Sequence, residues 1–255
     1  MIHTRCAVTA HETPAPNIFV LTFHSPEIAS SVKPGQFINV KVVESSFPLL
    51  RRPFSVYHVH DGEAGIIFDV RGIGTRILAS KGIGDELDII GPLGRPYGVD
   101  DAYGTAILVG GGLGVAPLPM ITLALKKSGR AIATFLGART RTLLVDSHLE
   151  NVSVSTDDGS AGFKGTVVDL LRSRLRADRY ERPKIFACGP NPMLRSLSLF
   201  AAEHQIPCEV SLESPMGCGV GICQGCPVAL ADHEGQYALI CRDGAVFDSR
   251  RVRIA

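Results

Sequence analysis

Four cysteines toward the C-terminus have a spacing that suits an iron–sulfur cluster. Cys218, Cys223 and Cys226 form a C-x4-C-x2-C run, and Cys241 follows it. This spacing is that of plant-type [2Fe-2S] loops. Glycines within the run free the backbone to wrap around a cluster and to direct amides at its sulfur atoms. The run predicts a [2Fe-2S] cluster, with a zinc site or a structural thiol cluster as the alternatives; zinc more often uses C-x2-C pairs or includes His.

A second candidate site is a glycine-rich turn between a predicted strand and a predicted helix. Gly110, Gly112 and Gly114 precede an apolar stretch that starts at Pro117. Glycines let a phosphate approach the backbone, and a helix N-terminus supplies unpaired N–H groups. The turn predicts a nucleotide site, although an ordinary tight turn would look the same. Because Pro117 replaces the third glycine of the dinucleotide fingerprint and no acidic residue ends the next strand, at 137–139, a standard Rossmann dehydrogenase is not expected.

Two segments in the N-terminal half could also bind phosphate. Arg51–Ser55 carries two arginines, whose guanidinium groups suit bidentate phosphate binding. Gly72–Thr75 places a backbone amide and a hydroxyl at the start of a short predicted helix. Each segment alone could be a surface arginine or a helix cap. Their joint presence indicates a cofactor that contains a pyrophosphate.

The residues up to about Gly98 follow a β pattern that could position these segments. Short apolar or alternating runs recur roughly every ten residues, between turns rich in Pro, Gly and Asp. With one short helix predicted at 75–80, this pattern favours a small antiparallel barrel. The predicted strands are 18–23, 37–43, 54–59, 65–70 and 86–91.

From Thr105 onward, strands alternate with helices of about 10 to 15 residues, which is typical of βαβ units and a parallel sheet. The clearest helix is predicted at 117–127. Farther along the chain the alternation stops and cysteine and glycine become dense. We therefore predict a multidomain α/β fold: an antiparallel β-barrel at 1–98, a parallel-sheet α/β domain at 99–212 and a small cluster module at 213–255.

Composition excludes several classes of function. The 255 residues include 26 basic and 25 acidic side chains, and the net charge of +1 gives no case for nucleic acid or an acidic membrane surface as a partner. The uncharged segment 102–125 is long enough to span a bilayer, but its glycines and prolines indicate a strand, a turn and a helix. The N-terminus lacks the apolar stretch of a secretion signal, so we expect a cytoplasmic protein with reduced cysteines. Cys6, Cys188 and Cys208 are expected to be buried as small hydrophobic residues.

Taken in order, the motifs resemble those of the electron-transfer subunits of dihydroorotate dehydrogenase B, within the ferredoxin-NADP reductase superfamily. The resemblance covers nearly the whole chain, and it departs at Asp69, where many relatives carry a basic residue, and at Ala245, where they often have proline. It rests on LLRRPFS at 49–55, GIGT at 72–75, GPLG at 91–94, GGGLGVAPL at 110–118, STDDGSAGFKG at 155–165, ACGPNPML at 187–194, SLE at 211–213, and the cysteine pattern that ends in CRDGAVF.

The resemblance implies that the barrel binds FAD, the α/β domain binds NAD and the C-terminal module holds a [2Fe-2S] cluster. Ser55 is a candidate for a hydrogen bond near the flavin N5 atom, and Glu213 is a candidate for the nicotinamide side. The implied FAD-binding residues are Arg52, Pro53, Phe54, Ser55, Ile67, Phe68, Asp69, Gly74 and Thr75. The implied NAD-binding residues are Gly110, Gly112, Gly114, Cys188, Gly189 and Pro190. The implied cluster ligands are Cys218, Cys223, Cys226 and Cys241.

A chain with these three sites is expected to convert between two-electron and one-electron transfer, because a flavin can do both. The resemblance implies that electrons come from the FMN of a separate dihydroorotate dehydrogenase catalytic subunit and pass through the cluster and FAD to NAD+, in pyrimidine (UMP) biosynthesis. It also implies a heterotetramer of two such chains with two catalytic subunits. The alternatives are an NAD(P)H–ferredoxin oxidoreductase, a transhydrogenase subunit or a sulfhydrogenase subunit. An alternative from another class is a non-redox scaffold that binds zinc and a nucleotide.

The choice between NAD and NADP rests on conflicting signs. Arg139 and Arg141 follow the second predicted strand of the α/β domain, where a 2′-phosphate could be held. The resemblance implies NAD, and NAD is what we expect.

Overall fold

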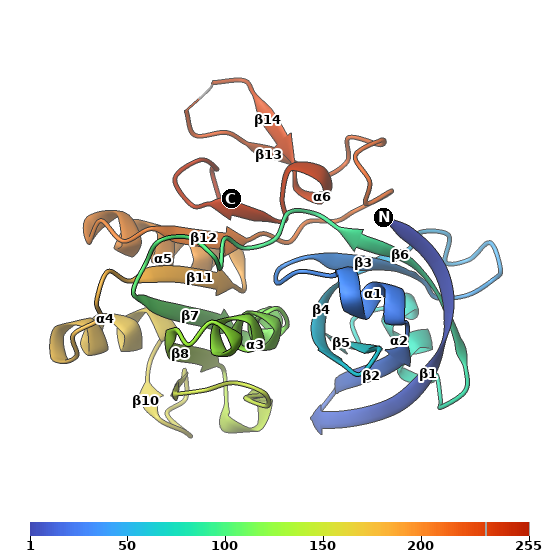
Figure 1. Cartoon of the computed structure of the whole chain (residues 1–255), viewed down its shortest axis with the longest axis horizontal. Coiled ribbons are helices and arrows are strands. Elements are labelled where there is room, and N and C mark those ends of the chain that lie inside the picture. The colour runs from blue at the N-terminus through green and yellow to red at the C-terminus, as the bar shows by residue number, and fades with distance from the viewer. Residues whose placement is uncertain (233, 255) are drawn as a thin grey trace.

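The N-terminal part of the chain forms a closed antiparallel barrel (Figure 1). The structure is a computed structural model that describes residues 1–232 and 234–254. The strand order around the barrel is β1-β2-β5-β4-β3-β6. The strands are β1 (Ile2–Ala15), β2 (Ile18–His24), β3 (Phe37–Lys41), β4 (Arg52–His60), β5 (Glu63–Asp69) and β6 (Glu86–Leu93), and two helices accompany them, α1 (Pro26–Ser31) and α2 (Ile73–Ala79).

Alternating side chains fill the barrel. Leu21, Ile38, Ile66 and Ile89 are fully buried inside it, each from a different strand. The five predicted strands correspond to β2 through β6. Strand β1 was not predicted, because polar residues alternate with its few buried ones, yet it pairs with both β2 and β6 and so closes the barrel.

The second part is a seven-stranded sheet with the order β10-β9-β8-β7-β11-β12-β15. All neighbouring strands are parallel except β15, which pairs antiparallel with β12 at the edge. Every residue of the central strand β7 is buried, as expected for a parallel strand covered on both faces. The strands are β7 (Thr105–Gly111), β8 (Ala131–Ala138), β9 (Val152–Thr156), β10 (Phe163–Lys164), β11 (Lys184–Cys188), β12 (Cys208–Ser211) and β15 (Val246–Asp248).

Helices cover the two faces of this sheet. Alternate residues of β7 point to opposite faces: Leu108 packs with α3, whereas Ile107 packs with α4 and α5. The helices are α3 (Leu118–Lys127), α4 (Val167–Ala177) and α5 (Asn191–Glu203), with the 3-10 helices η1 (Gly112–Val115) and η2 (Arg141–Leu143) in the loops. The segment 102–125 is thus a strand, a turn and a helix, and among the described residues no helix could cross a membrane.

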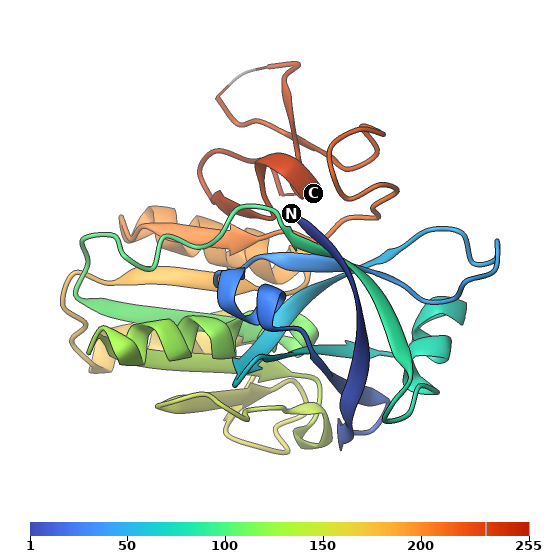
Figure 2. The ribbon, with the colours of Figure 1, turned by 45° about the vertical axis from the view of Figure 1, so that its right-hand side comes forward.

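The C-terminal part lies over the junction of barrel and sheet (Figures 1 and 2). It contains the hairpin β13 (Pro227–Ala229) and β14 (Tyr237–Leu239) and the short helix α6 (Ile240–Asp243). Its last strand, β15, then joins the large sheet, which covers the edge of β12. The C-terminal segment therefore supplies part of the second sheet as well as the cysteine-rich loop.

Candidate functional site

Arg52 on β4 lies against the first turn of α2. A Cβ on Gly74 would lie 2.6 Å from the Arg52 Nε atom, so only glycine allows this approach. The hydroxyl of Thr75 accepts hydrogen bonds from the backbone N–H groups of Arg71 (2.9 Å) and Gly72 (3.2 Å), which fixes the turn before the helix. First-turn amides of a helix have no partner within the helix. The fold thus places an arginine beside such amides, an arrangement suited to a phosphate group.

These residues border a cleft of about 300 Å³ between the barrel and the sheet, which we name the barrel cleft. It brings together the predicted FAD-binding residues, with Gly74 in contact with Arg52, and two predicted nicotinamide-side residues. The barrel contributes Arg52, Pro53, Phe54, Ser55, Ile67, Phe68, Asp69 and Thr75, and the opposite wall includes Leu113, Cys188, Ser211, Glu213 and Met216.

Two titratable groups on the opposite wall, Cys188 and Glu213, have raised pKa values. Burial raises the pKa of the Cys188 thiol, and the nearby Glu213 charge adds to the rise, so the group is not a thiolate. Although Glu213 is exposed overall, loss of water within this concave cleft raises the pKa of its carboxyl, while the Arg71 guanidinium opposes the rise. The wall is firmly held, since the buried Tyr97 hydroxyl donates to the carbonyl next to Cys188, at Ala187 (2.7 Å).

An ion pair stands at one end of the barrel cleft. The Nε of Arg71 lies 2.8 Å from both carboxylate oxygens of Asp69, and the hydrogen bond with Asp69 raises the pKa of Arg71. Arg71 was not among the predicted site residues. Because Arg71 pairs with Asp69, the acidic residue that departs from the family pattern does not stand as an isolated negative charge.

A larger cleft of about 710 Å³, which we name the sheet cleft, opens at the carboxyl ends of the parallel strands. Ligands of open α/β sheets bind at this edge. Asp69, Arg71 and Leu113 border both clefts, so the two clefts adjoin. The lining includes Gly111, Gly112 and Leu113 at the end of β7, Gly137, Ala138 and Arg139 at the end of β8, Asp157 after β9, and Pro190, Pro192 and Met193 after β11.

The predicted glycines have different roles here. Gly112 has a φ of +54° and faces open space, so its backbone is accessible from the sheet cleft. A Cβ on Gly110 would meet core leucine side chains, and a Cβ on Gly114 would lie 2.0 Å from the carbonyl oxygen of Cys188. Gly189 likewise lies close to the backbone of the glycine turn. Three of these glycines therefore allow close packing around the loops that follow β7 and β11, namely Gly110, Gly114 and Gly189. Gly112 differs from them, because its backbone is open to a ligand in the sheet cleft.

The sheet cleft also holds an acidic residue. Arg139 and Asp157 both line it, whereas the N–H of Arg141 donates to the hydroxyl of Ser160 (2.8 Å) in the adjoining loop. The end of β8 lacks the acid of a standard dinucleotide site, but the next strand, β9, supplies one at Asp157. An acid at this edge suits the ribose hydroxyls of a nucleotide.

The four candidate cluster cysteines lie in two pairs. The Sγ atoms of Cys226 and Cys241 are 3.2 Å apart. In the other pair, Cys218 Sγ accepts hydrogen bonds from the N–H groups of Cys223 and Val220, each at 3.4 Å. Two pairs of thiols suit two irons better than one zinc.

The surroundings of the cysteine thiols shift the pKa values of two of them in opposite directions. Partial burial acts against ionisation of Cys218, but backbone amides, led by that of Cys223, lower its pKa to about 6. Burial and the adjacent Cys226 raise the pKa of Cys241 to about 12, so two thiolates at this spacing require a bound positive charge. A Cβ on Gly217 would lie 3.2 Å from Cys223 Sγ, so glycine keeps the space around that sulfur open. The donor set fits an iron–sulfur cluster.

Comparison with known proteins agrees with this geometry. Residues 213–253 match the family model described as the iron–sulfur cluster binding domain of dihydroorotate dehydrogenase B. The dihydroorotate dehydrogenase B (NAD(+)) electron transfer subunit of Desulforamulus reducens is 38% identical, over 93% of each chain. That of Bacillus caldolyticus is 37% identical, over 97% of each chain. The chain belongs to this family of electron transfer subunits.

Solved structures support the same fold. A structure of an NADH-dependent reduced ferredoxin-NADP oxidoreductase, described in a study of flavin-based electron bifurcation, superposes with a TM-score of 0.87 at 33% identity, covering 98% of this chain and 90% of that chain. The ferredoxin reductase of carbazole 1,9a-dioxygenase, with a TM-score of 0.65 at 18% identity over 81% of this chain and 67% of that chain, shares the fold alone. The predicted family and fold class are confirmed.

Several residues at these sites were not predicted from the sequence. Arg71, Asp157 and Met216 line the clefts, and Asn39 is hydrogen-bonded to the cysteine loop. The position of Asp157 after a predicted strand could have indicated it, but Asn39 lies within a strand and carries no local signal. Cys6, Cys188 and Cys208 are buried as expected.

Proposed function

We propose that this chain carries electrons from the FMN of a dihydroorotate dehydrogenase catalytic subunit to NAD+, through a [2Fe-2S] cluster and FAD, in pyrimidine biosynthesis. The observation that carries the proposal is the adjacency of three sites. The barrel cleft adjoins the sheet cleft through Asp69, Arg71 and Leu113. It also includes Ser214 and Met216, which lead into the cysteine loop. The candidate flavin site is therefore the middle of three connected sites.

The residues of this chain would bind and orient the groups rather than act as acids or bases. When bound, a flavin exchanges a hydride with a nicotinamide and single electrons with an iron–sulfur cluster. Arg52 and the α2 amides would hold the pyrophosphate, and Ser55 would form a hydrogen bond near the flavin N5. Neutral Cys188 and partly desolvated Glu213 would face the nicotinamide, where they exclude water without adding a nucleophile.

The sheet cleft would hold the dinucleotide. The Gly112 backbone would approach the pyrophosphate, Pro190 would border the nicotinamide half, and Asp157 would accept hydrogen bonds from the adenosine ribose. A carboxylate at the ribose favours NAD, since it would repel a 2′-phosphate. Arg139 stands in the same cleft and would oppose this preference.

The surface around the cysteine loop would dock the catalytic subunit. Cys223 is exposed, and its neighbour Ile222 is 80% exposed. The loop before β4 presents Phe47 and Leu49, which are 69% and 76% exposed, and it lies beside the segment 214–216 that leads into the cysteine loop. Electron transfer requires a donor close to the cluster, so we place the FMN-containing subunit on this face, in a complex of two plus two chains.

A ferredoxin is the competing electron partner. The structure at 33% identity belongs to a ferredoxin-NADP oxidoreductase, which is nearly as similar to this chain as the curated relatives. Both partners would approach the same cysteine loop, so the fold does not distinguish them.

Co-expression with a barrel-type, FMN-containing dihydroorotate dehydrogenase tests the proposal. The two chains should co-elute in size-exclusion chromatography, and the complex should reduce NAD+ with dihydroorotate. Separate elution without NAD+-linked activity would overturn the assignment and favour a ferredoxin partner. Reduction of a plant-type [2Fe-2S] ferredoxin by NADH, measured with the isolated chain, would then support the competing function.

A further inference from the structure

A buried asparagine of the barrel is hydrogen-bonded to the loop that carries the first candidate cluster cysteine. Asn39 lies on β3 and is 2% exposed. Its Nδ2 atom donates to the backbone carbonyl of Cys218 at 3.0 Å. Because the acceptor is a carbonyl oxygen, only the amide NH2 can satisfy it. This contact directly joins the candidate flavin-binding barrel to the candidate cluster loop.

The loop backbone lies directly on this amide. Gly219, the residue after Cys218, has a φ of +71°, which favours glycine. A Cβ at that position would lie 2.0 Å from Asn39 Nδ2. Glycine is thus required twice, for the turn and for the approach of Asn39. The sequence and the geometry of the cysteine loop fit the asparagine beneath it.

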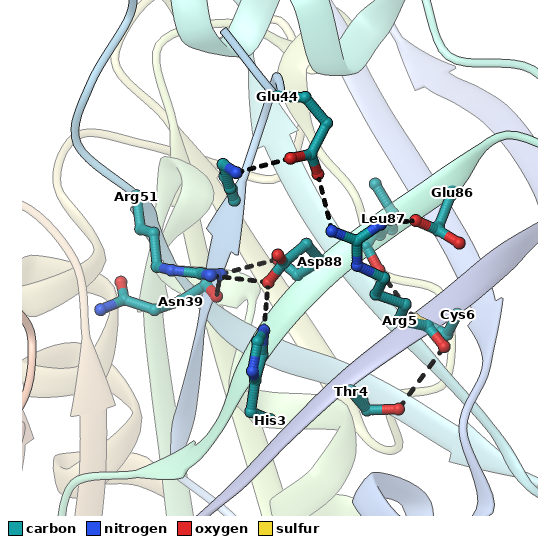
Figure 3. A network of polar contacts seen from close by, with 11 residues as sticks. His3, Thr4, Arg5, Cys6, Asn39, Glu44, Arg51, Glu86, Leu87 and Asp88 are labelled. Carbon is teal, nitrogen blue, oxygen red and sulfur yellow. Dashed lines mark hydrogen bonds and ion pairs between the residues drawn. The ribbon is translucent and has the colours of Figure 1, made fainter. Parts of the chain in front are cut away.

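Asn39 is itself held in place by a charged network in the barrel (Figure 3). Its backbone carbonyl accepts from Arg51 Nη1 (3.4 Å), and Arg51 Nη2 lies 2.6 Å from Asp88 Oδ1. His3 Nε2 contacts the same carboxylate oxygen at 2.8 Å. Across the strand pair, Asn39 is in register with Pro53 of the candidate flavin-binding segment. The network therefore fixes Asn39 relative to the segment that follows Arg51.

Arg51 thus differs from its neighbour Arg52. Arg52 contacts the start of α2, whereas Arg51 points into the network around Asp88 (Figure 3). The two arginines are adjacent in sequence but contact different parts of the barrel. Arg52 contacts the candidate phosphate-binding turn, and Arg51 contacts Asn39 and Asp88 on the side of the cysteine loop.

We propose that Asn39 is a positioning residue that sets the place of Cys218, and with it the candidate cluster, relative to the flavin-binding segment. The inference rests on the proposed cluster ligands and the proposed FAD site. Asn39 would act through Cys218 and not by touching the reacting atoms. Replacing a group that orients a metal ligand from outside the ligand set typically lowers metal affinity or activity by about 10- to 100-fold.

The test substitutes Asn39 and follows the cluster by two readouts that do not depend on activity. Asn39→Leu keeps a similar size but leaves the Cys218 carbonyl without its donor. Asn39→Asp would place a carboxylate oxygen against the Cys218 carbonyl oxygen, and the two would repel each other. Both variants should retain FAD, release iron to a chelator about 10- to 100-fold faster than the unaltered protein, and give a changed electron paramagnetic resonance spectrum of the reduced cluster. Thr22→Val is the matched control, because Thr22 is another buried barrel residue whose hydroxyl is hydrogen-bonded, to His58 (3.2 Å), away from the cysteine loop.

The outcomes separate the inference from the proposed function. An unaltered protein that purifies anaerobically without a [2Fe-2S] cluster would overturn the proposed function and this inference with it. If the cluster is present and Asn39→Leu matches Thr22→Val in iron release and spectrum, the inference alone is overturned. If Asn39→Leu does not fold, Gly219→Ala displaces the same contact from the loop side, and an unchanged spectrum in that variant would overturn the inference.

Discussion

At the residue scale, Cys223 is the candidate ligand most separate from the rest of the fold, since it is exposed on the cysteine loop and lines neither cleft. Cys223→Ser should lose most of the iron and sulfide but keep FAD, because the barrel residues that would bind FAD do not contact it. Iron, sulfide and flavin analysis with visible absorption spectra measures this. Cys208→Ala, at a buried cysteine of β12, is the control and should retain the cluster. Stoichiometric zinc in the unaltered, anaerobically purified protein would contradict the prediction.

Asp157 carries the prediction about the nicotinamide cofactor. If its carboxylate accepts from the ribose, Asp157→Asn should lower kcat/KM for NADH by about 10- to 100-fold, which corresponds to about 1.5–3 kcal/mol for a charged hydrogen bond. The discrimination against NADPH should fall as well. Flavin reduction with each cofactor measures both effects. Asp158→Asn is the matched control, because Asp158 is hydrogen-bonded to Ser160 (2.6 Å) and should leave kcat/KM unchanged. A preference of the unaltered protein for NADPH would show that Arg139 decides the specificity.

The raised pKa of Glu213 leads us to expect that the stability of the protein depends on pH. Its pKa is raised in the folded protein by loss of water, so between the unfolded and folded pKa values the folded state binds more protons. The free energy of unfolding therefore falls as pH rises through that window. Glu213→Gln removes this effect and should raise Tm at pH 7, with the difference vanishing below about pH 4, near the ordinary pKa of a glutamate. Thermal unfolding between pH 4 and 8 tests it, and equal Tm values at every pH would refute it.

Residues within motifs could be predicted from the sequence, and residues that act across the fold could not. Arg52 and Thr75 belong to short patterns whose chemistry is visible locally, and the barrel does bring them together. Arg71 and Asn39 become site residues only through contacts with the ion pair and with the cysteine loop. In the sequence, Asn39 is an ordinary buried strand position, and its role depends on a hydrogen bond with Cys218, which lies 179 residues farther along the chain.

At the element scale, the turn into α2 brings a glycine of the helix into direct contact with an arginine side chain of β4. Gly74→Ala would place a Cβ 2.6 Å from Arg52 Nε, so Arg52 must move away from the first turn. We expect FAD affinity to fall by about tenfold or more, since a charged hydrogen bond to phosphate contributes about 1.5–3 kcal/mol. Flavin fluorescence titration of the apoprotein measures the change. Gly82→Ala is the control, because Gly82 lies beyond the other end of α2 and a Cβ there meets nothing within 4 Å. Equal FAD affinity in the two variants would contradict the proposed role of Arg52.

The predictability of elements depended on how much of each element is apolar. Strands β2 through β6 and helix α3 contain continuous or alternating apolar runs, and they appear within a few residues of the predicted positions. Strand β1 was missed because its outward side chains are polar and its inward ones are few. Strand β15 has only three residues, and what makes it a strand is the open edge of β12, which the local sequence does not reveal.

At the scale of the whole molecule, the C-terminal segment is fixed to both other parts. Strand β15 extends the sheet, and a β-bridge between Arg95 and Ala245 joins the same segment to the end of the barrel. Asn39 adds a third connection, from inside the barrel. The candidate cluster loop is thereby held against the barrel, and the segment that leads into it borders the barrel cleft. Such a fixed arrangement suits electron transfer, which depends on constant distances between the carriers.

This arrangement predicts different behaviour for the isolated chain and for its complex. With FAD in the barrel cleft and NAD in the sheet cleft, as proposed, neither cleft is left for dihydroorotate. The isolated chain should therefore pass electrons from NADH to ferricyanide but leave dihydroorotate unchanged. Cys226→Ser should retain NADH–ferricyanide activity, because the flavin can serve that acceptor directly, yet it should abolish or strongly reduce NAD+-dependent oxidation of dihydroorotate in the complex. Steady-state assays of both forms measure the contrast. If Cys226→Ser left the activity of the complex intact, electrons would have to reach the flavin without the cluster, and the proposed order of the three sites would be wrong.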